Sequence, residues 1–387
     1  MKIALVTPYE ISQFSGVNSH VINLAKEFRV QGHDVHILAP CDKRRTDLSG
    51  IPFFSLGRSY PIPAGGSVAQ LSISVWKHRG IKRYLKQESF DVVHAHEPFN
   101  PVPVWNVMWA SPTVNVATFH AYNEATRRLL VFKPVLNLVD RTIHGRIAVS
   151  TAAHSFVSSH FPGDYSVIPN GVDVSHFSNP RSRLPEFDDG KINILFVGRA
   201  ESRKGLIYLI GALARLKWRN SNVRLIVAGP GNPDDLCAQY VVERGVQHDV
   251  VFVGSPAWED LPSYHHSADI FCTPATGRES FGLVLAEGMA AGLPVVATNI
   301  AGHASVAEDG NSAILVPPKD ETALADALQS LVEDAALRQR YATAGQEVAQ
   351  QYRWDRVSER VMAKYEATIS TVKGNSPHLP PETQTTD

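Results

Sequence analysis

The stretch Glu279–Glu287, which reads ESFGLVLAE, places two carboxylates eight positions apart across a change from polar to apolar residues. It runs directly into the apolar segment Leu283–Leu293, a pattern typical of a loop that feeds the N-terminus of a buried helix. The free backbone N–H groups of such a helix start favour an anion such as a diphosphate. Eight positions are slightly more than two helical turns, so both carboxylates can face one cleft and accept hydrogen bonds from sugar or ribose hydroxyls.

A second interpretation of the same stretch involves no ligand. Glu279 would cap the helix, and Glu287 would pair with a lysine on the surface. Spaced acidic residues are common on helices, so the stretch alone leaves both interpretations open.

Around this stretch, apolar runs of β type alternate with helical patterns along the whole chain. Expected helices include Asn18–Gln31, Leu206–Leu216 and Glu321–Gln351. Strands that are apolar on both faces and alternate with helices predict parallel sheets covered on both sides. We therefore expect an α/β fold of two doubly wound, Rossmann-like domains, with the carboxyl ends of their strands facing a common cleft. The expected strands are Ile3–Val6, His36–Leu38, Val92–Ala95, Val114–Thr118, Ile147–Val149, Ile192–Val197, Val223–Ala228, Val250–Val253, Ile270–Thr273, Pro294–Ala297 and Ala313–Val316.

The length of the chain, 387 residues, also predicts more than one domain. In residues 179–185, NPRSRLP, apolar residues do not recur at the spacing of a helix or a strand, which indicates a boundary between two domains. We expect a first domain over 1–178 and a second over 179–355. A helix over 356–373 would return to the first domain, and the Pro- and Thr-rich tail 374–387 would be disordered.

Composition excludes several classes of protein. The 37 Lys and Arg residues balance 38 Asp and Glu residues, so no overall field favours nucleic acid. Cys41, Cys237 and Cys272 form neither a disulfide framework nor a zinc pattern, which fits a reducing compartment. Residues 2–6 before Pro8 indicate a strand and not a signal peptide, and no uncharged apolar stretch reaches about 18 residues. We expect a cytoplasmic protein, either free or bound to a membrane surface.

Basic residues follow the first strand of the second domain. Ile192–Val197 runs into GRAESRKG, which places Arg199 and Lys204 on a loop at the carboxyl end of a strand. A guanidinium fork and an ammonium group there can neutralise a diphosphate leaving group. A solvated basic loop is the alternative, and we expect the third basic residue, Arg203, to lie on the surface.

Two candidates follow strands of the first domain. His120 comes just after Val114–Thr118 and can donate to a sugar hydroxyl or to charge that develops at a reacting carbon, although a lone histidine is more often structural. Gly16 precedes a helix that we expect to begin at Asn18 or Ser19. A glycine there lets the backbone approach a ligand closely, although an ordinary turn explains a single glycine as well.

Other patterns argue against a metal or a dinucleotide cofactor. His94 and His96 alternate along one strand, but no acidic or cysteine set completes a metal site around them. The glycines of Gly229–Gly231 lack the third glycine of a dinucleotide fingerprint, because Asp234 occupies its place. We therefore expect no cofactor and no protein-bound metal.

The segment 76–86 holds the one local concentration of positive charge. At about 100° per residue, four basic side chains fall on one arc of a helix, and Ile81, Tyr84 and Leu85 fall on the opposite side. A basic stripe of this kind suits anionic lipid headgroups, and the solvated outer face of a helix is the alternative. The four residues are Arg79, Lys82, Arg83 and Lys86.

In combination, these motifs resemble the retaining glycosyltransferases with a Glu-x7-Glu signature, glycosyltransferase family 4. That family has the GT-B fold of two facing Rossmann-like domains. The resemblance covers Met1 to about Lys373, and within the family it points to the phosphatidylinositol α-mannosyltransferases. The finer likeness is carried by GVNSHV (16–21), PIP (61–63), GSVA (66–69), FDVVHAHEP (90–98), GRIAVS (145–150) and IPNGVD (168–173).

The resemblance implies a nucleotide-diphosphate sugar, GDP-mannose, as the donor bound by the second domain. Arg199, Lys204 and the backbone of Gly16 would hold its diphosphate. Glu279 would bind hydroxyls of the transferred sugar, and Glu287 would bind the ribose. The backbone that would meet the sugar and phosphates belongs to Phe281, Gly282, Leu283 and Val284.

On the acceptor side, the resemblance implies an anionic lipid of the phosphatidylinositol type, reached from the inner face of the cell membrane. His120 would line the reaction centre, whereas Tyr9 and Asn18 lie where such enzymes meet the inositol headgroup. The basic helix of residues 77–86 occupies the position of the family's membrane-binding helix. The sequence indicates no oligomeric state.

The chain departs from the family pattern in two places. Residues 255–260, SPAWED, lack the acidic pair expected near the base, so a UDP-sugar stays open as the donor. Phe14-Ser15-Gly16 stands where Pro-Gly-Gly is expected. Three alternative functions stay open. The protein could be a transferase of the same family with a soluble acceptor, a nucleotide-sugar epimerase or phosphorylase, or a non-catalytic binding module.

Overall fold

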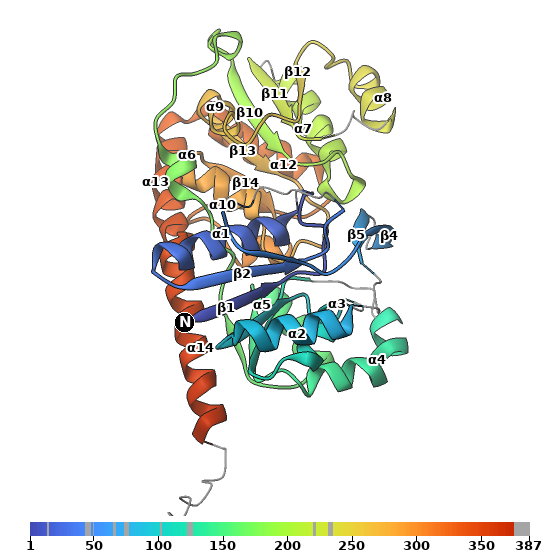
Figure 1. Cartoon of the computed structure of the whole chain (residues 1–387). Helices are drawn as coiled ribbons and strands as arrows, with labels where there is room; N and C mark the ends of the chain where they lie inside the picture. The colour runs from blue at the N-terminus through green and yellow to red at the C-terminus, as the bar shows by residue number, and fades with distance from the viewer. Residues whose placement is uncertain are drawn as a thin grey trace, which may run out of the picture.

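Two parallel β-sheets, each covered by helices on both faces, form the body of the protein (Figure 1). This is the two-domain α/β architecture that the sequence predicts. None of the described helices is long and apolar enough to cross a lipid bilayer. The computed structural model describes residues 1–13, 15–42, 48, 50–64, 67–72, 77–100, 103–121, 127–219, 222–230 and 235–374.

The first sheet has seven strands in the order β3-β2-β1-β6-β7-β8-β9, and every neighbouring pair is parallel. Its central strands β6 and β7 are buried along their whole length and β1 is buried from Ile3 onward, which explains why they read as continuous apolar runs. An antiparallel hairpin, β4 (Tyr60–Ala64) with β5 (Ser67–Leu71), accompanies this sheet and was not predicted. The strands of the sheet are β1 (Lys2–Val6), β2 (Asp34–Ala39), β3 (Phe53–Ser55), β6 (Val92–His96), β7 (Val114–Phe119), β8 (Gly145–Ala148) and β9 (Tyr165–Val167).

Alternation along the strands gives the first sheet two apolar faces. In β1, Ile3 and Leu5 belong to the core beneath α1 (Gly16–Val30) and α14 (Trp354–Gly374), whereas Ala4 and Val6 belong to the opposite core. Tyr365 of α14 is fully buried, and its hydroxyl lies 2.6 Å from His94 Nδ1. The opposite face is covered by α2 (His78–Glu88), α3 (Pro103–Ala110), α4 (Arg127–Asp140) and α5 (Thr151–His160).

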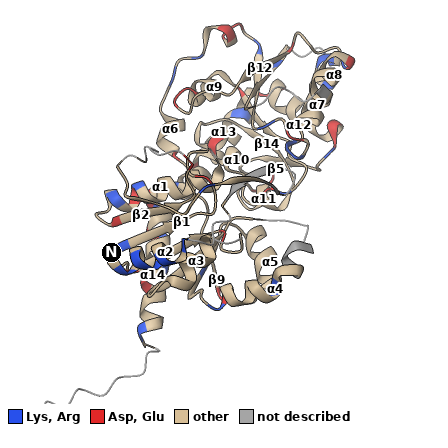
Figure 2. Cartoon of the chain, turned by 45° about the vertical axis from the view of Figure 1, so that its right-hand side comes forward, with Lys and Arg blue, Asp and Glu red and all other residues tan. Residues whose placement is uncertain are grey.

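The basic side of α2 faces outward, as the helical arc predicts. Ile81 and Leu85 are fully buried against the first sheet, and Tyr84 is half-buried. The four basic side chains are exposed, and Figure 2 shows the blue basic residues that α2 carries. These four are Arg79, Lys82, Arg83 and Lys86.

The second sheet has six parallel strands in the order β12-β11-β10-β13-β14-β15. Two buried clusters lie on its two faces, one beneath α7 and α12 and the other beneath α10. The strands are β10 (Ile192–Val197), β11 (Val223–Ala228), β12 (Val250–Gly254), β13 (Ile270–Thr273), β14 (Val295–Thr298) and β15 (Ile314–Val316). The helices are α7 (Leu206–Trp218), α8 (Asp235–Glu243), α9 (Leu261–Ser267), α10 (Leu283–Ala290), α11 (Ala301–Ala304), α12 (Glu321–Glu333) and α13 (Ala335–Ala349).

The prediction of one helix over Glu321–Gln351 is wrong, because Asp334 divides it. Asp334 has an extended backbone, and its side chain accepts a hydrogen bond from the N–H of Leu337 at the start of α13. An aspartate that caps in this way competes with continuation of the helix.

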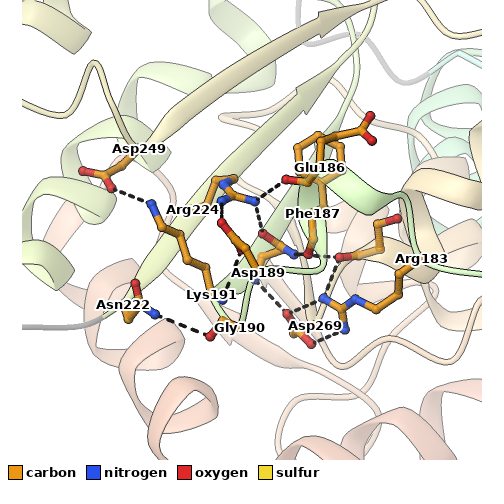
Figure 3. Close-up of polar contacts among 12 residues, drawn as sticks. Arg183, Glu186, Phe187, Asp189, Gly190, Lys191, Asn222, Arg224, Asp249 and Asp269 are labelled. Carbon is orange, nitrogen blue, oxygen red and sulfur yellow. Dashed lines mark hydrogen bonds and ion pairs between the residues drawn. The ribbon is translucent and has the colours of Figure 1, made fainter.

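Polar contacts fasten the segment between the sheets to the second sheet (Figure 3). After α6 (Val174–Ser178), Arg183 forms a two-pronged ion pair with Asp269, at 3.0 and 3.1 Å. Farther along, Arg224 of β11 binds Asp189. The boundary between the first and second domains, between residues 178 and 179, stays a prediction. Residues 375–387 of the Pro- and Thr-rich tail, and Phe14, lie outside the described residues.

Candidate functional site

The loop before α10 and the first turn of that helix form one side of the candidate site. α10 begins at Leu283 with Gly282 as its N-cap, and Gly282 has φ +83° and no side chain to cap with. Among the described residues, none accepts a hydrogen bond from the N–H groups of Leu283 and Val284. The ligand-free interpretation is therefore wrong in its first part, because Glu279 does not cap the helix. The helix start instead offers unused donors to an anion.

Glu279 is held by two cations. One of its carboxylate oxygens lies 2.6 Å from Lys204 Nζ and 2.7 Å from Arg203 Nη1. Burial alone would raise the pKa of Glu279, but Lys204 and Arg203 hold this pKa below its ordinary value. The carboxylate is consequently ionised at neutral pH and can accept hydroxyl hydrogen bonds.

The prediction that Arg203 lies on the surface is wrong. Ser202–Lys204 forms a single 3-10 turn, and this turn directs both Arg203 and Lys204 toward Glu279. The guanidinium of Arg203 also binds Glu201 through Nε, at 2.9 Å. Arg203 thus links the two acidic residues of the site.

Arg199 lies farther out than Lys204. Its Nη1 is 3.0 Å from Glu201 Oε1, and its side chain is 49% exposed. Glu201 therefore contacts Arg199 on one oxygen and Arg203 on the other. The result is a row of alternating charges that ends at the Glu279–Lys204 pair.

Glu287 lies in the second turn of α10, within range of the charge on Lys204. Burial raises the pKa of Glu287 to about 7, and the positive charge of Lys204 opposes this shift. Within the described part of the chain, no hydrogen bond to the carboxylate contributes to this shift. The second part of the ligand-free interpretation is therefore wrong too, because Glu287 pairs with no surface lysine. Both carboxylates of the motif lie within the field of one lysine.

His120 lies on the first-domain side, just after β7, as the strand-end pattern predicts. It is almost fully buried, and its Nε2 is 3.0 Å from His96 Nδ1. Its ring also meets His20 of α1 edge-on, with ring centroids 4.9 Å apart. Burial, together with the neighbouring His20 and His94, lowers the pKa of His120 well below its ordinary value. The imidazole is neutral at physiological pH, so it can both donate and accept.

His120 is positioned by Glu97, which was not among the predicted site residues. Glu97 follows β6, and its carboxylate accepts the backbone N–H of His120 at 2.5 Å. The backbone of Glu97 has φ +53°, an unusual value for a residue with a side chain. Burial raises the pKa of Glu97 to about 7. Its place directly after a buried strand is the same signal that identified His120.

The structure also groups histidines that are far apart in the sequence. His20, His96 and His120 bring their ring nitrogens within 4.8 Å of one another, which is the one such grouping in the described ranges. Burial lowers the pKa of His20 to about 4, so this ring is neutral as well. Neutral imidazoles are the form that binds metals, but one contact here is already a histidine–histidine hydrogen bond. These three residues are the described ones that can hold a metal.

Tyr9 lies in the loop after β1 and Asn18 in the first turn of α1, and the two side chains differ in their contacts. The amide of Asn18 is buried and donates to the carbonyls of Glu10 and Gln13, so it fastens the loop. The hydroxyl of Tyr9 accepts a hydrogen bond from Asn100 at 3.1 Å, and Tyr9 as a residue is partly exposed. Of the two side chains, Tyr9 is the one placed to contact a further ligand.

The first helix begins earlier than expected, at Gly16 and not at Asn18 or Ser19. Ser15 is its N-cap, and the Ser15 side chain accepts a hydrogen bond from the N–H of Asn18. A Cβ atom at Gly16 would lie 3.5 Å from Leu283 Cδ1. The N-termini of α1 and α10 therefore lie close together across the junction of the two sheets.

A second contact joins the two halves at the same place. Ser150, the N-cap of α5, donates through its hydroxyl to the carbonyl of Ser280. Val149 and Val172 of the first half share a buried cluster with Phe281 and Leu285 of the second. The loop that carries Glu279 is therefore supported from both domains.

Two family models match the chain, Glycosyltransferase Family 4 over residues 14–176 and Glycosyl transferases group 1 over residues 181–348. The chain is 38% identical to the phosphatidyl-myo-inositol mannosyltransferase of Mycobacterium tuberculosis, over 96% of this chain and 98% of that protein. It is 37% identical to the protein of the same name from Mycolicibacterium smegmatis, over 96% and 94%.

Solved structures share the fold at low sequence identity. A glycosyltransferase from Rickettsia africae matches with a TM-score of 0.78 and 19% identity, over 95% of this chain and 98% of the other. Anabaena HepE, solved with UDP and glucose, matches with a TM-score of 0.74 and 19% identity, over 95% and 100%. The GT-B architecture expected from the sequence is confirmed.

Proposed function

The chain belongs to glycosyltransferase family 4, and from that premise we propose that it transfers mannose from GDP-mannose to a phosphatidylinositol-type lipid with retention of the α configuration. That the protein is a glycosyltransferase follows from relatives at 37–38% identity over nearly its whole length. The proposed donor, acceptor and stereochemistry go further. They are supported by the mannosyltransferase activity for which those relatives are named and by the chemistry of the site. We place the reaction at a membrane surface, on the cytoplasmic side.

One observation supports the donor site above the others. The Glu279 carboxylate, Lys204 and Arg203 meet beside a helix start whose first N–H groups are unused. Cations and helix donors suit the diphosphate, and an ionised carboxylate suits the hydroxyls of the sugar. In this proposal Glu287 binds the ribose, and Arg199 leaves Glu201 to complete the diphosphate site.

The chemistry of transfer breaks the bond between the anomeric carbon and the diphosphate oxygen. The electron pair stays on the diphosphate, so Lys204, Arg203 and the start of α10 stabilise the charge that develops in the transition state. The acceptor hydroxyl oxygen bonds to the anomeric carbon on the same face, and its proton passes to the leaving phosphate. His120, held by Glu97, donates to a hydroxyl of the transferred sugar. Contact between the two domains at Gly16 and Leu283 excludes water that would hydrolyse the donor.

A glycine substitution tests the close approach of the diphosphate to α1. Gly16→Ala is expected to keep the melting temperature, since its Cβ would make an ordinary contact with Leu283 and alanine favours a helix. Transfer is expected to fall by about tenfold or more, because a methyl group would stand between the backbone and the diphosphate. Differential scanning fluorimetry and initial rates measure the two effects. Gly80→Ala, in open space on α2, is the matched control and should lower neither the melting temperature nor the transfer rate.

The raised pKa of Glu287 predicts a pH dependence of donor binding. Two hydrogen bonds from ribose hydroxyls require an ionised carboxylate, and the pKa of Glu287 is about 7. The affinity for GDP-mannose should therefore rise as pH increases from 6 to 8. Glu287→Gln, which does not titrate, should bind more weakly and show a flatter profile. Calorimetry across this range is the measurement, and an equally steep profile in the variant would reject the assignment.

The function itself is tested by product analysis. The purified protein is incubated with phosphatidylinositol vesicles and, separately, with GDP-mannose, UDP-glucose and UDP-galactose, and the glycolipid is identified by mass. The proposal predicts a phosphatidylinositol that has gained one hexose with GDP-mannose alone. Residues 255–260 lack the acidic pair expected near guanine, so the UDP-sugar arms test the leading alternative donor. Donor alone, and donor with phosphate, test for epimerase and phosphorylase activity.

A further inference from the structure

The outer side of α4 carries an apolar stripe. Val131, Phe132, Val135 and Leu138 are 73%, 54%, 37% and 51% exposed. Positions 131, 135 and 138 recur at helical spacing and share one face. The other side of the same helix packs into the first-domain core through Leu136 and Val139. The helix is therefore apolar on both its inner and outer sides, which a helix surrounded by water does not require.

Trp109 extends this stripe onto α3. The Trp109 side chain is 43% exposed at the C-terminal end of α3, and its ring lies 6.1 Å from that of Trp105. Helix α3 contacts both α2 and α4. Its sequence, 103–110, holds no charged residue, and residues 127–139 hold no acidic one. Exposed tryptophan next to aliphatic residues is typical of surfaces that meet a membrane interface.

The stripe and the basic side of α2 face the same way. Buried residues of α2, α3 and α4 all contribute to one core cluster on one face of the first sheet, so the outer sides of these helices point to a common side. In Figure 1 the three helices lie next to one another, and in Figure 2 the described part of α4 and α3 are mostly tan where α2 is blue. The surface thus combines positive charge with exposed apolar side chains.

Along the sequence, α3 and α4 follow shortly after the residues on the acceptor side of the site. Six residues separate His120 from the first residue of α4, and two separate Asn100, which binds Tyr9, from the first residue of α3. Both helices consequently start from the sheet edge where His120 and Tyr9 lie. A lipid held along α4 would have its headgroup near that edge.

We propose that Val131, Phe132, Val135, Leu138 and Trp109 enter the interfacial layer of a lipid bilayer while α2 binds its anionic headgroups. The inference rests on the proposed function, since it assigns the surface that brings the lipid acceptor to His120. An amphipathic helix lies in the interface with its apolar side at the boundary between headgroups and acyl chains, and added basic residues strengthen binding to anionic lipid. A second copy of the chain fits less well, because a symmetric contact would bring two basic surfaces together.

Vesicle sedimentation with matched variants tests the proposal. Phe132→Gln with Leu138→Gln removes the most exposed aromatic and leucine side chains of the stripe and keeps good helix formers. This stripe variant should bind vesicles of phosphatidylcholine, with or without phosphatidylinositol, about tenfold more weakly than the wild type. Lys82→Gln with Arg83→Gln should lose only the preference for phosphatidylinositol. Leu236→Gln with Val242→Gln, on the exposed side of α8, is the control and should bind as the wild type does.

Fluorescence shows which surface enters the bilayer. Brominated phosphatidylcholine should quench wild-type tryptophan emission, and Trp109→Phe should remove a large part of that quenching. Wild-type binding by the stripe variant would overturn the proposal. A second result would also overturn it: a wild-type protein that is a dimer, and a stripe variant that is a monomer but binds vesicles as the wild type does. A second copy of the chain would then cover the stripe.

The two proposals fail in different ways. If the wild type binds vesicles through the stripe but makes no glycolipid with any nucleotide sugar, the proposed function is wrong and the membrane surface stands. If the stripe variant binds vesicles and makes glycolipid at the wild-type rate, the membrane surface is wrong and the proposed function stands. Calorimetric binding of GDP-mannose by the stripe variant should equal that of the wild type, which shows that the donor site is intact.

Discussion

Replacing Glu279 with alanine should lower kcat for mannosyl transfer by about 10³-fold while the affinity for GDP-mannose changes little. The carboxylate is expected to bind hydroxyls of the transferred sugar, and it lies 2.6 Å from Lys204 Nζ. Without it the sugar loses its acceptor, but Lys204 and Arg203 keep their positive charge and still attract the diphosphate. The loss should therefore appear in kcat and not in the dissociation constant of the donor.

Two further variants separate this role from a merely structural one. Glu279→Gln keeps one carbonyl acceptor and should lose about tenfold less activity than Glu279→Ala. Glu201→Ala removes a carboxylate that binds Arg203 and Arg199 but is not expected to meet the sugar. It should keep most of the activity. Initial rates, donor calorimetry and circular dichroism give the comparison, and unchanged turnover in Glu279→Ala would refute the assignment.

Replacing Lys204 with alanine should lower kcat/KM for GDP-mannose by about 10³-fold, with the loss of donor binding visible as well. The positive charge of Lys204 opposes the effect of burial on the pKa of both Glu279 and Glu287. Its removal should raise both pKa values. The rising limb of the pH–rate profile should consequently move to higher pH in the variant.

The matched control for this lysine is Lys217→Ala. Lys217 lies in the last turn of α7 and pairs with Asp249 at 3.0 Å, away from Glu279. It should leave donor binding and the pH profile unchanged. Lys204→Arg should recover part of the activity, because it restores the charge with a different shape. A Lys204→Ala protein with the wild-type profile would show that the diphosphate binds elsewhere.

The central strands were predictable because parallel strands buried on both faces read as continuous apolar runs. Ile192–Val197, Val223–Ala228 and Ile270–Thr273 have the predicted bounds. The short strands β3 and β9 were missed, since each has three residues and none of them is buried. So few residues, only partly covered, leave no pattern to recognise.

The site was predictable where a residue follows a buried strand. Lys204 is far in the sequence from Glu279 and Glu287, yet its positive charge acts on both carboxylates in the structure. The prediction that Arg203 lies on the surface was wrong, because charge alone does not indicate where a side chain points. A single 3-10 turn directs two consecutive basic residues to one carboxylate.

The histidine grouping and the α4 stripe could not be read from the sequence. His20, His96 and His120 come from a helix and two strand ends, and only the strand order of the first sheet brings them together. The stripe on α4 consists of the same residue types as a buried helix face. Only the packing of Leu136 and Val139 shows which side is left outside.

Titration calorimetry with GDP-mannose tests most directly whether the two domains hold a nucleotide-diphosphate sugar at Lys204, Arg203 and the start of α10. We expect saturable heat at one site per chain, and GDP should compete for that site. Absence of heat with GDP-mannose and with every UDP-linked hexose would contradict it.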